Sequence, residues 1–574
     1  MKKLRVLFLV SYSLLSAQQK DFRTVFEKGN GNQGATYQQA IAFYELLAES
    51  FPAIKIQQTG MTDSGKPLHI VIYNPEKVFV FSEIRKKKAV ILINNGIHAG
   101  EPDGIDATMM LFRDLATGKL KTPVNTVLVT IPVYNIGGAL NRNSTTRANQ
   151  DGPEEYGFRG NARNFDLNRD FIKADTKNTK SFYEIFHLTD PEIFIDNHVS
   201  NGADYQYVLT YIMTQHNKLG QELGQYMNDK LTPAIVSDLK KKKVESTPYV
   251  NAWSDTPDKG FAQFFEPPRF ATGYTSLFNT IGFVVETHML KKYPLRVKAT
   301  YDFMVSALAY TDAHSAEIKE ARLKNAVHYT AGTAYPVQWQ IDSSKVETIS
   351  FLGYEGSHKK SDATTGKRLF YDRNKPFNQK IPFYKEYKPL QEVLIPTAYI
   401  IPQGWWPVID LLRINKIEVR QLATDTLIDV ESYRIADYKT SPSAYEGHYL
   451  HRNTKIISSG VKVKFSKGDY YIPTNQKGVK YLLETLEPEA TDSFFNWNFF
   501  DTILQQKEGY SDYVFEDLAA ELLKENPALQ SQLEKKRNSD KAFNDNPEAQ
   551  LDWIYKNSVY YEKAHLQYPV YRVK

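Results

Sequence analysis

Short apolar runs divided by amphipathic segments dominate the first half of the chain. Each run is only a few residues long and bounded by polar or turn residues, which is typical of buried β-strands. The runs are residues 89–93, 127–133, 193–196 and 282–286. Residues 105–116 repeat apolar side chains at helical spacing, and Gly118 follows as a stop signal. Alternating strands and helices predict an α/β fold: a mixed, mostly parallel sheet with helices on both faces.

The pattern changes after about residue 325. Residues 340–390 are polar and turn-rich, and we interpret them as short strands and connections. A strand, a helix and a strand are then predicted at residues 397–402, 408–412 and 417–422. This β-α-β order indicates a second α/β module. The tail is predicted to be helical, with Asn546 as N-cap and Pro547 at the first helical position.

The first seventeen residues have the layout of a secretory signal peptide. A basic start, residues 1–5, precedes a short apolar run at residues 6–15 and a small pair, Ser16-Ala17, where cleavage is expected. The alternative is a buried N-terminal strand or helix. No other stretch approaches the roughly 18 apolar residues of a membrane-spanning helix. We therefore expect export to the periplasm or the cell exterior. Together with the change of pattern near residue 325, this predicts a signal peptide at 1–17, a first domain at 18–325 and a C-terminal module at 326–574.

Composition limits the possible partners and chemistry. The 574 residues carry 71 Lys+Arg against 66 Asp+Glu, a net charge of +5. Lys2, Lys3 and Arg5 lie in the predicted signal peptide, so the remainder is close to neutral and gives no case for nucleic-acid binding. The chain has no cysteine, which excludes disulfides and a thiol nucleophile. Any metal site must be built from His, Asp and Glu side chains.

A histidine and a carboxylate follow the first apolar strand in a glycine-rich turn. His98 and Glu101 are three residues apart, Gly100 lets the backbone come close, and Pro102 stiffens the exit. Both side chains can point at one cation, and a catalytic zinc usually takes three protein ligands and one water. Taken alone, the same four residues also fit a solvated loop.

Three further polar stretches lie where the α/β pattern predicts strand ends. In Asp166-Leu167-Asn168-Arg169 the amide and the guanidinium suit a carboxylate ligand, although a surface turn with a salt bridge is the alternative. His198 closely follows the strand at 193–196 and is placed to be a third metal ligand. Glu286 ends the strand at 282–286, where an acid needs a partner or a task.

Together these stretches resemble the zinc metallocarboxypeptidase family, the carboxypeptidase A-like enzymes, over roughly residues 40–320. His98, Glu101 and His198 match the family's zinc motif. Asp166 to Arg169 matches its Asp-x-Asn-Arg stretch, and Glu286 matches its catalytic glutamate. The resemblance implies a carboxypeptidase-like fold and one zinc ion per chain.

The resemblance also implies a role for each matching residue. Asp166 would orient the first zinc histidine. Asn168 and Arg169 would hold the terminal carboxylate of a peptide substrate. Glu286 would act as the general base that takes a proton from the attacking water.

Two further roles depend on less specific positions. The family has an upstream arginine that polarises the scissile carbonyl; we assign it to Arg147, with Arg142 as the rival. Its mobile tyrosine is assigned to Tyr274, which takes part in substrate binding.

The other histidines are expected to have structural roles. His288 lies two residues after Glu286, and we expect it to pack or to form hydrogen bonds rather than act in catalysis. His448 and His451 form a loose second metal pattern that we discount.

The leading functional hypothesis is a secreted zinc metallocarboxypeptidase that acts on peptides with a free C-terminus. A second hypothesis is a zinc amidase of the same fold that cuts cell-wall peptides or acyl-amino acids. A third is a catalytically inactive peptide-binding homologue. The role of residues 326–574 and the oligomeric state stay open.

Overall fold

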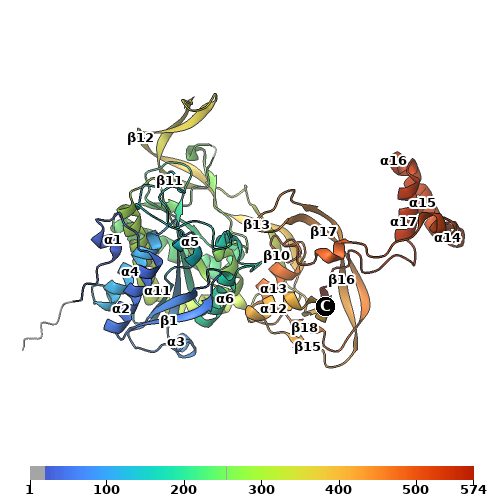
Figure 1. The fold of residues 1–574 in the computed structure, drawn as a ribbon, viewed down its shortest axis with the longest axis horizontal. Helices are drawn as coiled ribbons and strands as arrows, with labels where there is room; N and C mark the ends of the chain where they lie inside the picture. Colours follow the sequence, from blue (N-terminus) through green and yellow to red (C-terminus); the bar gives the residue numbers. More distant parts are fainter. Residues whose placement is uncertain (1–19, 254) are drawn as a thin grey trace, which may run out of the picture.

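The computed structural model describes residues 20–253 and 255–574 (Figure 1). The predicted signal peptide, residues 1–17, lies outside the described residues. Within the described ranges, no helix has the length and apolar character needed to span a bilayer.

An eight-stranded sheet forms the centre of the first half. Its order is β1-β2-β4-β3-β5-β9-β6-β7, and the four central strands β4, β3, β5 and β9 run parallel. The predicted strands are confirmed as β3, β4, β5 and β9. The bounds are β1 Ile54–Met61, β2 Pro67–Tyr73, β3 Ala89–Asn95, β4 Thr126–Ile131, β5 Ile193–Ser200, β6 Leu209–Met213, β7 Ser246–Pro248 and β9 Ile281–His288.

Helices cover both faces of this sheet, as the sequence predicts. In β3 every residue is buried. Val90 and Leu92 belong to one apolar cluster, which includes α6 (Lys177–Thr189), whereas Ile91 and Ile93 belong to the other, which includes α4 (Asp103–Ala116). This alternation is the two-residue period of a strand whose faces are both covered.

The helix predicted over residues 105–116 is α4, and the chain leaves it through Gly118 at φ 75°. The other helices of the first half are α1 Val25–Lys28, α2 Tyr37–Ser50, α3 Phe81–Lys87, α5 Ile136–Leu140, α7 His216–Leu219, α8 Gln221–Tyr226, α9 Thr232–Lys241, α10 Ala271–Thr275 and α11 Tyr293–Ala326. The long α11 packs against α4, so both lie on the same face of the sheet.

A second sheet is present in the C-terminal half, in the order β15-β18-β14-β19-β16-β17. Every pairing in it is antiparallel. The predicted strand, helix and strand are β14, α12 and β15, but β18 pairs with both strands and lies between them. The bounds are β14 Ala398–Ile401, α12 Trp406–Ile414, β15 Arg420–Gln421, β16 Thr426–Thr440, β17 His451–Phe465, β18 Tyr470–Pro473, α13 Val479–Leu486 and β19 Tyr571–Val573.

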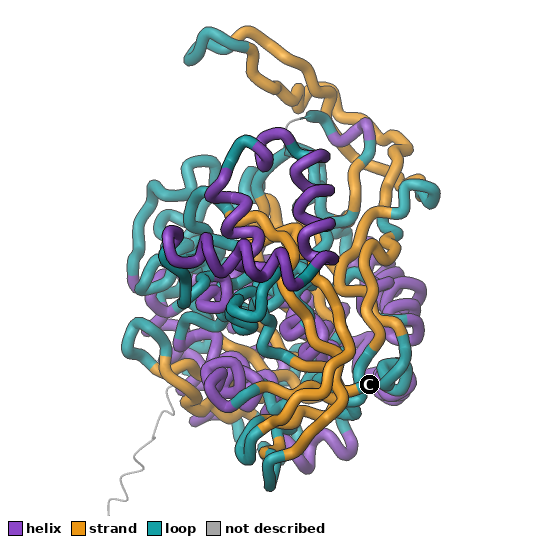
Figure 2. Tube along the Cα trace, turned by 90° about the vertical axis from the view of Figure 1, so that its right-hand side faces the viewer, coloured by secondary structure: helices purple, strands orange, loops and turns teal. Residues whose placement is uncertain are grey.

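The expectation of short strands at residues 340–390 is wrong. The segment contains the long hairpin of β11 (Glu347–Lys360) and β12 (Lys367–Tyr384), followed by β13 (Tyr387–Leu394), which pairs with β10 (Ala334–Ile341). The hairpin projects from the body, so much of it is exposed and lacks the apolar alternation that marks a half-buried strand (Figures 1 and 2). Its base pairs with β8 (Phe261–Ala262) and packs on the first half of the chain.

The tail is helical, as predicted, and stands apart from the body in Figure 1. The side chain of Asn546 caps α17 by accepting the backbone N–H of Ala549. The helices share a small apolar core of their own, to which Leu533, Leu551 and Tyr555 contribute. Their bounds are α14 Asp512–Glu525, α15 Pro527–Ser539, α16 Lys541–Asn544 and α17 Pro547–Lys556.

Candidate metal centre and active site

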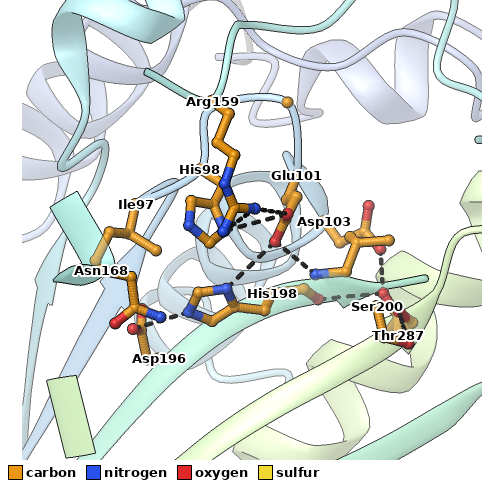
Figure 3. A network of polar contacts seen from close by, with 12 residues as sticks. Ile97, His98, Glu101, Asp103, Arg159, Asn168, Asp196, His198, Ser200 and Thr287 are labelled. Carbon is orange, nitrogen blue, oxygen red and sulfur yellow. Dashed lines mark hydrogen bonds and ion pairs between the residues drawn. The ribbon is translucent and has the colours of Figure 1, made fainter. Parts of the chain in front are cut away.

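Three buried residues meet at the carboxyl end of the parallel strands (Figure 3). His98 lies in the loop that leaves β3, where Gly96 takes a φ of 65° and turns the chain. Glu101 stands just before α4, and His198 lies near the end of β5. Since β3 and β5 are adjacent parallel strands, the topology brings these residues to one place.

The three side chains form a compact donor set. The Nδ1 atom of His98 lies 3.2 Å from one carboxylate oxygen of Glu101, and that of His198 lies 3.3 Å from the other. One potential ligand atom from each residue lies within 4.8 Å of the other two, and all three side chains are nearly inaccessible to solvent. Two imidazoles and a carboxylate are the donor chemistry of a catalytic zinc site.

A carboxylate stands behind each histidine. His98 Nε2 lies 3.0 Å from Asp166 Oδ1, and His198 Nε2 lies 2.9 Å from Asp196 Oδ2. Both carboxylates lie beside Nε2, and the Nδ1 atom of each ring faces Glu101; carboxylates orient metal-binding histidines in proteins in this way. The donor set therefore fits zinc. Sequence reasoning missed Asp196, although its position two residues before His198 puts it on the same face of β5.

Glu101 is fixed by two donors besides the histidines. Its carboxylate accepts the N–H of Val199 at 2.8 Å and a guanidinium N–H of Arg147 at 2.8 Å. Burial raises the pKa of this carboxyl, but the charges of His98 and Arg147 outweigh burial and hold the pKa well below its usual range. Glu101 is therefore ionised, as a metal ligand must be.

Glu286 faces the same space from the next strand. It is the register partner of His198 across the parallel pair β5 and β9, so both side chains project from the same side of the sheet. Burial, together with the charges of Glu101 and Glu266, raises the pKa of Glu286 to about 8, against the opposing charge of His198. Its Oε2 has no hydrogen-bond partner among the described residues and is free to take a proton.

A cavity of about 580 Å³ opens beside these side chains, and Asn168 and Arg169 line it. Asn168 Oδ1 accepts the N–H of Ala271 at 3.1 Å, and the guanidinium of Arg169 lies 4.1 Å from the ring centre of Phe270. The cavity is therefore bordered by a fixed amide and a guanidinium, suited to an anionic group.

The expectation that Asp166 to Arg169 closes a strand is wrong. Among the described residues no strand lies between the end of β4 at Ile131 and this stretch, and Leu167–Arg169 form a single 3₁₀ turn in a long loop. The turn starts at Asp166, whose carboxylate accepts the N–H of Asn168 at 2.9 Å. Asparagine and aspartate often stabilise such turns, so the same residues serve the turn and the site.

Of the two candidate arginines, Arg147 lines the cavity. Besides Glu101, its guanidinium donates to the carbonyl of Val199 at 3.1 Å. Arg142 instead donates to the carbonyl oxygen of Glu155 at 2.9 Å and lies outside the cavity lining.

Sequence reasoning missed a third arginine at the cavity, Arg159. One guanidinium nitrogen lies 3.3 Å from Nδ1 of His98, and another donates to Asp166 at 2.8 Å. Its side chain is about half exposed, so it can reach both the donor set and a bound ligand. The signal that could have identified Arg159 in the sequence is its position seven residues before Asp166, in a glycine-rich stretch.

The assignment of Tyr274 to substrate binding is wrong. The side chain is fully buried, its hydroxyl donates to Asn415 Oδ1 at 2.6 Å, and its ring stacks on Tyr183 at 5.0 Å. Although Tyr274 lies close to Glu286 in sequence, its ring packs among other aromatic side chains beside α10 and does not line the cavity. Tyr249 and Trp253 line the cavity instead.

The three histidines to which the sequence analysis gave no catalytic role, His288, His448 and His451, have structural partners. The Nε2 atom of His288 lies 2.9 Å from the carbonyl oxygen of Ala203, and its Nδ1 accepts the N–H of Leu290, in agreement with the expected hydrogen-bonding role. His448 and His451 contact different carboxylates: Asp175 at 2.8 Å and Asp501 at 2.9 Å.

Comparison with known proteins agrees with this chemistry. The zinc carboxypeptidase family matches residues 40–201, a range that contains His98, Glu101 and His198 but ends before Glu286. Carboxypeptidase 2 of Trichophyton equinum is 22% identical over 427 residues, 71% of this chain and 73% of that protein. Carboxypeptidase 2 of Trichophyton rubrum is 21% identical over 488 residues, 81% and 84%. A metallo-carboxypeptidase structure from Burkholderia cenocepacia is 14% identical, with a TM-score of 0.37 over 49% of this chain and 70% of that one.

Proposed function

Because this chain belongs to the zinc carboxypeptidase family of peptidases, we propose that it removes C-terminal residues from peptides with the aid of one zinc ion. The observation that carries the proposal is the placement of a His-Glu-His donor set, an unpartnered glutamate and an Asn–Arg pair around one cavity. Each of these elements serves a different part of peptide hydrolysis.

His98, Glu101 and His198 would hold the ion. Zinc supplies Lewis acidity, which lowers the pKa of a water molecule to roughly 7 and polarises a carbonyl. Asp166 and Asp196 keep both histidines in the orientation that this requires.

Glu286 handles the protons. Its free Oε2 accepts a proton from the attacking water and then delivers it to the nitrogen of the leaving amine. A carboxyl whose pKa is raised by burial both accepts and releases a proton near neutral pH, which suits this double task.

Asn168 and Arg169 bind the terminal carboxylate of the substrate. Arg169 offers parallel charge-assisted N–H groups to the two carboxylate oxygens, and Asn168 adds an amide donor. This anchor would place the last peptide bond, rather than an internal one, next to Glu286. Two further guanidiniums at the cavity, those of Arg147 and Arg159, can donate to the developing oxyanion.

We also propose that the chain is exported. The support is the signal-like pattern of residues 1–17: a basic start, an apolar run and a small pair before Gln18. N-terminal sequencing of secreted protein tests this, and a mature chain that begins at Met1 would contradict it.

The decisive experiment for the activity uses matched peptides that differ only at the C-terminus, one with a free carboxylate and one with an amide. An unpaired Arg169 costs several kcal/mol with the amide, so we expect the free acid to react about a thousandfold faster. Release of the last residue is measured for both, together with the zinc content of the purified protein. Equal rates would favour a zinc amidase instead.

A further inference from the structure

A turn of the C-terminal module reaches the border of the active site. The hairpin between β16 and β17 ends at residues 445–448, where Glu446 and Gly447 take φ values of 50° and 82°. Gly447 packs against the ring of Phe165, the residue before Asp166; a Cβ at Gly447 would lie 3.1 Å from that ring. Left-handed backbone is unfavourable for glutamate, so its occurrence at a contact point indicates a task.

The task of Glu446 is visible in its contacts. Its carboxylate Oε2 accepts the backbone N–H of Asp166 at 2.9 Å. Asp166 in turn orients His98 and caps the turn that presents Asn168. The neighbouring His448 contacts Asp175 at 2.8 Å, which fastens the hairpin tip at a second point of the same loop.

A second carboxylate of the module supports the segment that contacts Asn168 and Arg169. Asp492 is completely buried; it accepts the backbone N–H of Arg269 at 2.8 Å and pairs with its guanidinium at 2.7 Å. The two residues after Arg269 are those that hold the Asn–Arg pair: Phe270 lies under the guanidinium of Arg169, and the N–H of Ala271 binds Asn168.

We propose that Glu446 and Asp492 are positioning residues for the substrate carboxylate. Each accepts one backbone N–H beside the Asn–Arg pair: Glu446 that of Asp166, at the start of the turn that carries Asn168 and Arg169, and Asp492 that of Arg269, before the two residues that contact them. The C-terminal module thereby defines the geometry of the binding pocket without touching the substrate. This inference rests on the proposed function, in which Asn168 and Arg169 bind a terminal carboxylate.

The test uses the full-length, zinc-loaded enzyme and the matched acid and amide peptides. Glu446→Ala removes the acceptor for the Asp166 N–H, whereas Glu446→Gln keeps a side-chain oxygen in its place. Loss of this hydrogen bond in Glu446→Ala should raise KM for the free-acid peptide about tenfold. The ratio of the rates on the acid and amide peptides should fall. We expect kcat to change by less than about threefold and Glu446→Gln to behave like the wild type.

Binding is measured separately from turnover. In an enzyme that also carries Glu286→Gln, calorimetry with the free-acid peptide gives Kd directly, and Glu446→Ala should weaken it by the same factor. Asp469→Ala is the matched control, because that carboxylate accepts the backbone N–H groups of Gln403 and Ser466 within the C-terminal module. The control should lower Tm and leave KM and Kd unchanged.

Each result has one meaning. Wild-type KM and Kd in folded Glu446→Ala would overturn the inference for Glu446. If Glu446→Ala does not fold, Asp492→Ala, which removes the acceptor for the Arg269 N–H, decides by the same comparison, and wild-type values there overturn the proposal. Failure of the proposed function is distinguishable, because then the wild type itself would not prefer the acid over the amide.

Discussion

The two sheets of this protein differ in what their strand ends bring together. In the eight-stranded sheet, β3, β5 and β9 run parallel, so His98, His198 and Glu286 lie together at one edge of the sheet, the edge formed by the carboxyl ends of these strands. In the six-stranded sheet every pairing is antiparallel, and consecutive strands end at opposite edges. His451, at the start of β17, contacts Asp501 there and joins no donor set among the described residues. Parallel topology concentrates buried polar groups, whereas antiparallel topology separates them.

The sharpest test of this contrast replaces one histidine in each sheet. His198→Ala should lose most of the bound metal and reduce turnover by at least about a thousandfold, since two donors remain for the ion. His451→Ala should keep the metal and the activity. Zinc content by elemental analysis and peptide hydrolysis check both, and full zinc occupancy in His198→Ala would refute the assignment of this ligand.

The second test separates proton transfer from metal binding on the same edge. Glu286→Gln keeps the shape of the side chain but removes the base, so kcat should fall by at least about a hundredfold. Zinc content should stay normal. Turnover close to that of the wild type would transfer the role of base to another residue.

The third test concerns the loop that borders this edge. Arg169→Ala should raise KM for free-acid peptides by about a hundredfold and reduce the preference for acid over amide, because the charge-assisted contact is lost. KM is measured for both peptides with wild type and variant. An unchanged acid-to-amide ratio would place the carboxylate site elsewhere in the cavity.

The smallest effect is expected at the contact between the two halves. Tyr274→Phe removes the hydroxyl that donates to Asn415 and should cost about 1 kcal/mol of unfolding free energy. KM and kcat should remain those of the wild type, because Tyr274 does not line the cavity. Denaturant titration and peptide hydrolysis measure the two quantities, and a marked loss of kcat would restore a catalytic role for this tyrosine.

The elements that sequence could predict are those with strong local signals. The central strands contain short apolar runs, and His98, Glu101, His198 and Glu286 follow or end these runs. The long hairpin was missed because its exposed strands need no apolar alternation. Asp196 was not identified because an acid inside an apolar run has no visible partner until His198 is placed two residues away on the same face.

Other features depend on tertiary contacts alone. Tyr274 precedes Glu286 closely in sequence, but the aromatic packing of α10 decides where its ring goes. Glu446 lies 280 residues from Asp166, and no local pattern could link them. Sequence therefore predicts the His-Glu-His donor set better than the loops that border the cavity.

The apolar cluster that joins the two halves has a consequence for how this chain can be divided. Phe278 of the first half stacks on Tyr481 of the second at 5.7 Å, and both are buried in one continuous cluster. A chain cut near residue 326 would expose that aromatic surface to water and lose the cap on Asp166 at the same time. A gene fusion, a truncation or an exchange between relatives therefore has to include both halves of the chain.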